Sequence, residues 1–113
     1  MESPGPEIRE KLEKLEALQS AFESTTVQKQ RIEEELAETE RAIEALKENA
    51  TEQVYQFLGK ILIKKDREKM LLELQERLEL LKLRSSALQK QEQKLKEKIQ
   101  ELGESVRGSL SGQ

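Results

Sequence analysis

Apolar side chains recur every seven residues along a first stretch of the chain, about residues 7–48, which contains neither glycine nor proline. A seven-residue apolar repeat is typical of coiled coils, in which the a and d positions of one helix pack on a partner helix. One row of the repeat contains Ile8, Leu15, Phe22, Lys29, Leu36 and Ile43, and the other contains Lys11, Leu18, Thr25, Ile32, Thr39 and Leu46. The pattern predicts one long helix, with Pro6 at its entry, where the missing N–H of proline costs nothing.

A second stretch, about residues 67–107, repeats the pattern with an unbroken row of leucines. Its d row is Leu74, Leu81, Leu88, Leu95 and Leu102, and its a row is Leu71, Leu78, Ser85, Glu92, Ile99 and Val106. Asp66 precedes this helix at the N-cap position, where a carboxylate accepts bonds from free backbone N–H groups. Because Gly108 weakens the far end, we expect residues 108–113 to fray.

The repeat is lost between the two stretches, where β-branched and aromatic residues replace it. Gly59-Lys60 fits a two-residue hairpin turn with glycine first, so we predict strands at about 53–58 and 61–65. The alternative is one helix running through the region, since a lone glycine in a helix costs only about 1 kcal/mol.

A hairpin would reverse the chain and make the two helices antiparallel. The numbers of two facing residues then add up to a constant. A sum of 117 places Leu46 opposite Leu71 and Leu15 opposite Leu102. Residues 7–48 carry 12 acidic and 7 basic side chains and residues 67–108 carry 8 and 10, so opposite charge favours pairing within the chain. The expected fold class is mostly α, a long antiparallel two-helix coiled coil joined by one β-hairpin.

Composition narrows the function classes. The chain has 38% charged and 35% apolar residues with a net charge of −3, which argues against a nucleic-acid partner. It contains no cysteine, no histidine and no recognisable catalytic or phosphate-binding motif, so we expect no enzyme activity, cofactor or metal. Without a run of roughly 18 apolar residues we also expect no membrane partner and a cytoplasmic location.

A row of leucines that follows basic residues is also typical of DNA-binding basic-zipper proteins. The chain fits this class poorly, because apolar residues 61–63 interrupt the basic cluster ahead of the leucine row.

The predicted hairpin is apolar on both faces and has two open strand edges. A two-stranded sheet of this kind is marginal alone and favours cover by other chains. We therefore predict oligomerisation through Val54, Tyr55, Phe57, Leu58, Ile61, Leu62 and Ile63.

Apolar side chains also gather where the antiparallel arrangement brings the two chain ends together. The candidates for weak binding of other apolar chains are Ile8, Leu12, Leu15, Leu102, Val106 and Leu110. The alternative is that they only close the coiled coil, which we favour for Leu15 and Leu102. For Leu12, which lies outside the heptad rows and is not needed for the helix–helix contact, and for Leu110 we favour binding.

The segment from Val54 to Ile63 (VYQFLGKILI) and the segment from Leu88 to Leu95 (LQKQEQKL) resemble the β subunits of archaeal prefoldin. The helix–hairpin–helix order and the length are similar as well. The resemblance implies one prefoldin-like domain over residues 1–113. Its helices would cover about 7–48 and 67–107, its hairpin about 53–65, and its tail 108–113.

The same resemblance implies a function. Prefoldin joins two α and four β subunits through their hairpins, and the tips of the coiled coils hold unfolded polypeptides. Prefoldin passes these to a group II chaperonin without using ATP. The expected partners are therefore an α-type subunit, further β copies, unfolded polypeptides and that chaperonin. The alternative is a structural or tethering coiled coil that binds no client.

Overall fold

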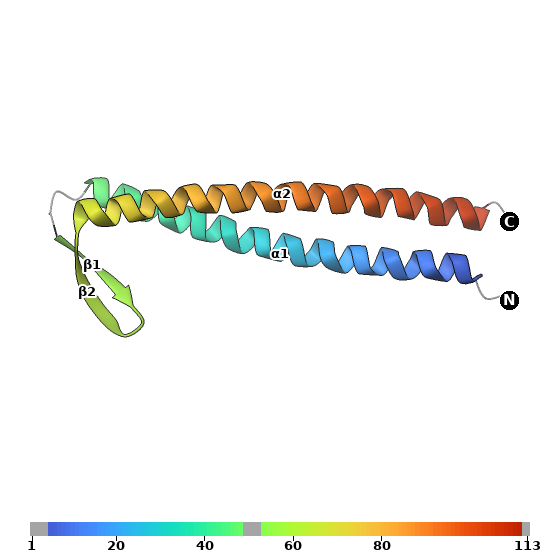
Figure 1. The fold of residues 1–113 in the computed structure, drawn as a ribbon, viewed down its shortest axis with the longest axis horizontal. Coiled ribbons are helices and arrows are strands. Elements are labelled where there is room, and N and C mark those ends of the chain that lie inside the picture. Colours follow the sequence, from blue (N-terminus) through green and yellow to red (C-terminus); the bar gives the residue numbers. More distant parts are fainter. Residues whose placement is uncertain (1–4, 49–52, 112–113) are drawn as a thin grey trace. The chain divides into compact units, whose positions relative to one another are not determined.

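The computed structural model describes residues 5–48 and 53–111, in which a β-hairpin lies between two long helices in chain order (Figure 1). Helix α1 spans Pro6–Glu48 and is followed by strands β1 (Gln53–Leu58) and β2 (Ile61–Asp66). Helix α2 spans Arg67–Ser111. The predicted fold class, two long helices with one antiparallel hairpin, is therefore confirmed, and α1 begins at Pro6 as expected.

Contacts divide the chain into two compact units. The terminal unit comprises residues 1–30 and 86–113, and the hairpin unit comprises residues 31–85. In the terminal unit α1 and α2 run antiparallel, since Lys11 Nζ donates to Ser109 Oγ (3.2 Å) and Thr26 Oγ1 donates to Glu92 Oε2 (2.9 Å). The start of α1 and the end of α2 consequently lie at the same extremity of this unit (Figure 1).

In the hairpin unit the helices are again antiparallel. Arg77 Nη2 donates to Glu35 Oε2 (2.8 Å), and Arg67 Nε donates to Leu46 O (2.6 Å). The second bond joins the start of α2 to a carbonyl in the last turn of α1, a group without a partner in its own helix. It therefore anchors the helix ends from which the hairpin departs.

Burial follows the predicted heptad rows. Every a and d position of both helices is buried or half-buried, including the polar ones. The most deeply buried apolar side chains are Ile8, Ile43, Leu46, Leu81 and Val106. A pair of helices has no second layer of cover, so most a and d side chains keep some contact with solvent.

The hairpin forms around the predicted turn. β1 and β2 pair antiparallel, with Leu58 opposite Ile61 and Val54 opposite Lys65. Gly59 has φ +61°, a left-handed conformation that glycine adopts without steric cost. The alternative of a continuous helix is therefore wrong for this segment.

Two expected boundaries need correction. α2 continues to Ser111, so residues 108–111 are helical rather than frayed, while residues 112–113 lie outside the described range. Gly108 costs the helix only about 1 kcal/mol, and Ser109 in the last turns accepts the bond from Lys11. β2 also runs one residue further than predicted, to Asp66, whose Oδ2 accepts from Lys69 N–H (3.4 Å) as the expected N-cap.

Candidate functional site

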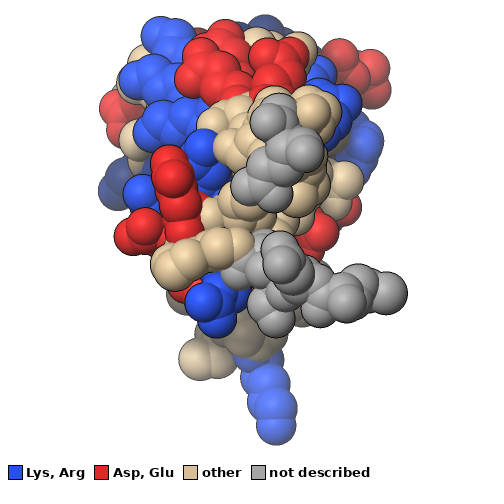
Figure 2. Space-filling view, turned by 90° about the vertical axis from the view of Figure 1, so that its right-hand side faces the viewer, with Lys and Arg blue, Asp and Glu red and all other residues tan. Residues whose placement is uncertain are grey.

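The six candidate binding residues near the chain ends fall into three groups. Ile8 and Val106 are buried, and Leu15 and Leu102 are half-buried, so these four close the helix–helix contact of the terminal unit. The remaining two are the outward-facing side chains Leu12, 42% exposed, and Leu110, 56% exposed. At this end of the unit, uncharged side chains form a central area with charged side chains around it (Figure 2). The exposed apolar side chains at this end of the unit are thus leucines that lie outside the heptad rows.

Two shallow grooves adjoin the helix–helix contact in the terminal unit. The larger, about 470 Å³, has Phe22 and Ile99 in its lining together with Gln19, Glu23 and Lys96. The second, about 330 Å³, is lined by Leu18 and Leu102 with Lys98, Glu101 and Ser105. Both combine apolar side chains with charged ones.

The seven predicted oligomerisation residues all lie in the hairpin, and six of them are exposed. The pleat places alternate side chains on opposite faces. Val54 and Gln56 are half-buried toward the helices, whereas Tyr55 and Phe57 point away, with Phe57 76% exposed. Within the hairpin unit, this outer face and both strand edges are open to other chains.

A groove of about 390 Å³ lies between the hairpin and the helices of the hairpin unit. It follows β1 over residues 54–57, and its lining includes no residue of β2. The helices contribute Ala42, Ala45 and Leu46 from α1 and Met70 and Leu74 from α2. The small side chains of Ala42 and Ala45 on α1 leave room for this space.

One polar atom beside this groove lacks a partner. Gln56 Oε1 is buried from solvent and accepts no hydrogen bond. Leaving a buried acceptor unpaired costs about 1–3 kcal/mol, so such an atom requires an explanation.

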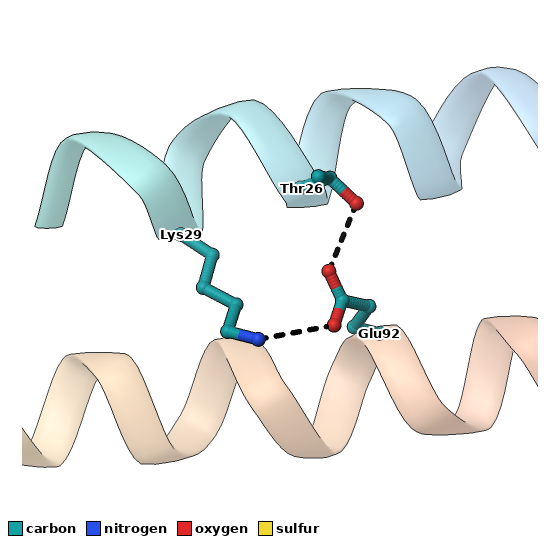
Figure 3. A network of polar contacts seen from close by, with 3 residues as sticks. All are labelled: Thr26, Lys29 and Glu92. Carbon is teal, nitrogen blue, oxygen red and sulfur yellow. Dashed lines mark hydrogen bonds and ion pairs between the residues drawn. The ribbon is translucent and has the colours of Figure 1, made fainter. Parts of the chain in front are cut away.

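Polar residues replace apolar ones in the terminal unit's helix–helix contact at the end of the unit away from the chain termini (Figure 3). Glu92 of α2 accepts from Thr26 Oγ1 (2.9 Å) through Oε2 and pairs with Lys29 Nζ (3.2 Å) through Oε1. Beside it, Gln91 Nε2 donates to Thr25 Oγ1 (3.3 Å). The Thr26 hydroxyl, followed by the Lys29 ammonium, lowers the pKa of Glu92 below its usual value. Hydrogen bonds thus hold the two polar core positions, Glu92 through Thr26 and Lys29, and Thr25 through Gln91.

A similar pair fixes β2 to α2. Lys65 Nζ lies 2.9 Å from Glu73 Oε2, and this bond and charge lower the pKa of Glu73. Together with the Arg67–Leu46 bond it ties the hairpin to the helix ends.

Sequence reasoning missed several features. The heptad pattern did not indicate the groove residues Ala42, Ala45 and Met70, which lie outside its rows. Small residues beside a heptad row can nevertheless indicate room for a neighbour. Three exposed leucines of α2, namely Leu72, Leu80 and Leu83, also lie outside those rows.

Within residues 5–48 and 53–111, no group of carboxylates has the arrangement of a metal site. The same residues include no helix that could cross a membrane.

A helical coiled coil that reverses through a single β-hairpin defines a prefoldin-type subunit, and the sequence comparison agrees. The profile of the family described as "Prefoldin subunit" matches residues 9–113. The chain belongs to the prefoldin family.

Within this family, several similar proteins are β subunits of archaea. The chain is 37% identical to prefoldin subunit beta of Pyrococcus abyssi, covering 97% of this chain and 95% of the relative. It is 35% identical to prefoldin subunit beta of Saccharolobus islandicus, covering 94% and 85%. The crystal structure of the prefoldin beta subunit from Thermococcus strain KS-1 superimposes with a TM-score of 0.85 at 32% identity, covering 97% of each chain. Membership of this family is consistent with a chaperone subunit that works in a hetero-oligomer.

Proposed function

We propose that this chain is a subunit of an ATP-independent cytoplasmic chaperone that holds unfolded polypeptides at the tips of its coiled coils and delivers them to a group II chaperonin. The observation that carries the proposal is the pair of exposed leucines near the chain ends, Leu12 and Leu110, which the helix–helix contact does not use. Unfolded polypeptides expose apolar side chains, and these leucines offer matching surface. The two grooves of the terminal unit add further apolar contacts.

Assembly of several subunits raises the affinity for an unfolded polypeptide. One leucine contact is weak, but several tips acting on one client raise the overall affinity by effective concentration. The hairpin's exposed apolar residues and open edges support assembly with an α-type subunit and further β copies. We assign two α and four β subunits to the complex, as the family resemblance implies.

The test is suppression of client aggregation. The complex is reconstituted with an α-type prefoldin subunit, and aggregation of a chemically denatured enzyme is followed by light scattering. The double variant Leu12→Ser, Leu110→Ser should suppress aggregation several-fold less well than the parent while keeping the mass of the complex. Transfer is tested by adding a group II chaperonin with ATP, which should recover enzyme activity from the parent complex.

The matched control is Leu80→Ser with Leu83→Ser, which removes two exposed leucines of the hairpin unit. It should leave suppression unchanged. Equal loss in both double variants would refute the tip assignment. A parent complex that suppresses no aggregation would instead indicate a purely structural coiled coil.

A further inference from the structure

Helix α2 carries an apolar row that, taken alone, suits pairing with an identical helix. Leucine occupies successive d positions of this row, at Leu74, Leu81, Leu88, Leu95 and Leu102. Leucine at d is typical of parallel two-stranded coiled coils, which form between identical helices. In the structure α2 instead pairs with α1 of its own chain, in antiparallel orientation. Both pairings use the same side chains of α2, so they compete.

A charged residue interrupts the a row that runs beside these leucines. Glu92 occupies an a position, and its side chain is only 21% exposed. In the terminal unit it reaches α1, where Lys29 Nζ lies 3.2 Å from its Oε1 and Thr26 Oγ1 donates to its Oε2 at 2.9 Å (Figure 3). Both oxygens of the carboxylate therefore have a partner in the pairing that the chain adopts.

A parallel pair of two α2 helices would surround the same carboxylate differently. In such a pair the a positions of the two helices face each other, so Glu92 would lie against Glu92 of the second copy. Two carboxylates that are largely withdrawn from water repel each other. The cation that contacts Glu92 in the structure, Lys29, lies on α1 and takes no part in that pair.

Helix α1 shows the reciprocal arrangement. Lys29 also occupies an a position, so a parallel pair of two α1 helices would bring two lysines together. Opposite charges at these two core positions thus favour α1 with α2, and like charges disfavour either helix with its own copy. Replacing a buried ion pair by apolar side chains is often neutral or stabilising, so stability alone does not account for this pair.

We propose that Glu92, with Lys29 as its counterpart, determines which helices pair. It favours α2 on α1 of its own chain and prevents α2 from forming a parallel leucine zipper with α2 of a second copy. This role goes beyond the proposed function and does not depend on it, because the helices must pair correctly whether or not the chain holds a client.

The test traps the competing pairing with a disulfide. The chain contains no cysteine, so Leu95→Cys introduces a single thiol into the d row of α2. The d positions of two identical helices face each other in a parallel pair, where two such thiols can form a disulfide. The full chain with Leu95→Cys is oxidised without partner subunits, and the linked dimer is measured by non-reducing gel electrophoresis. We expect little dimer, because α2 stays on α1.

Three variants in this background separate pairing specificity from stability. Glu92→Leu completes the apolar row and should raise the amount of linked dimer several-fold. Glu92→Lys also removes the bonds to Thr26 and Lys29 but keeps like charges between two copies, so it should lower the melting temperature without raising the dimer. The control Glu97→Leu removes a carboxylate from an exposed position of α2 outside the rows and should leave the dimer at the parent level.

The comparison of Glu92→Leu with Glu92→Lys decides between the explanations. An equal rise in dimer for both would overturn the proposal, because weakening the contact with α1 would then suffice to release α2. A parent level of dimer in Glu92→Leu would also overturn it, as would an equal rise in Glu97→Leu, which would reflect added apolar surface alone. Client holding is measured separately by light scattering, so its failure and the failure of this proposal are distinguishable.

Discussion

Leu81 provides the sharpest test of the helix pairing. It is the one apolar side chain among the described residues that is 0% exposed, whereas Leu83, two residues later on the same helix, is 69% exposed. The two leucines differ in burial but share residue type, helix and unit. Comparing Leu81→Ala with Leu83→Ala therefore isolates the effect of packing in the helix–helix contact.

The expected magnitudes follow from burial. Truncating a fully buried leucine removes its transfer free energy and leaves a cavity, for a loss of roughly 3 kcal/mol in a two-helix pair that relaxes in part. Leu83 loses little buried surface, and alanine is the better helix former, so its free energy of unfolding should change by less than about 0.5 kcal/mol.

The assay is urea unfolding followed by circular dichroism, on the chain without partner subunits. Protein concentration is held equal, since any self-association would stabilise the folded state by mass action. The midpoint should fall for Leu81→Ala with an unchanged m-value. Equal destabilisation by both substitutions would refute the heptad assignment in the hairpin unit.

Three further outcomes are expected. Gly59→Val forces a β-branched residue to φ +61°, which should weaken the hairpin by about 1–2 kcal/mol and speed amide hydrogen exchange in both strands. Asp66→Ala removes the cap from Lys69 N–H and should lower the free energy of unfolding by about 1 kcal/mol, measured by urea unfolding. The Thr26 hydroxyl and a lysine ammonium lower the pKa of Glu92, so its contribution to stability is complete above about pH 4.5 and is lost as pH falls through the lowered pKa. Melting temperatures of Glu92→Gln should accordingly fall less steeply between neutral pH and pH 3 than those of the parent.

Local rules account for most of the fold. The turn at Gly59, the cap at Asp66 and the start of α1 at Pro6 each depend on near neighbours in the chain, and all were predicted correctly. The end of α2 was not, because the helix continues past Gly108 where Ser109 reaches Lys11 across the pair. That bond joins residues 98 positions apart, and no local pattern indicates it.

The candidate sites divide in the same way. Leu12 lies outside the heptad rows, so the sequence predicts that it takes no part in the helix–helix contact. Its exposure confirms this, although client binding stays a prediction. The groove along β1 could not be predicted, because Ala42, Ala45 and Met70 form it only once the hairpin folds over the helix ends.

The sequence by itself determined the two helices, the reversal between them and the rows that pair, since all three follow from periodicity and turn chemistry over a few residues. Only the tertiary structure decided which hairpin face turns toward the helices, that Gln56 Oε1 is left without a donor, and that Glu92 reaches Thr26 and Lys29. These depend on distances between segments far apart in the chain, which the packing of one segment on another sets.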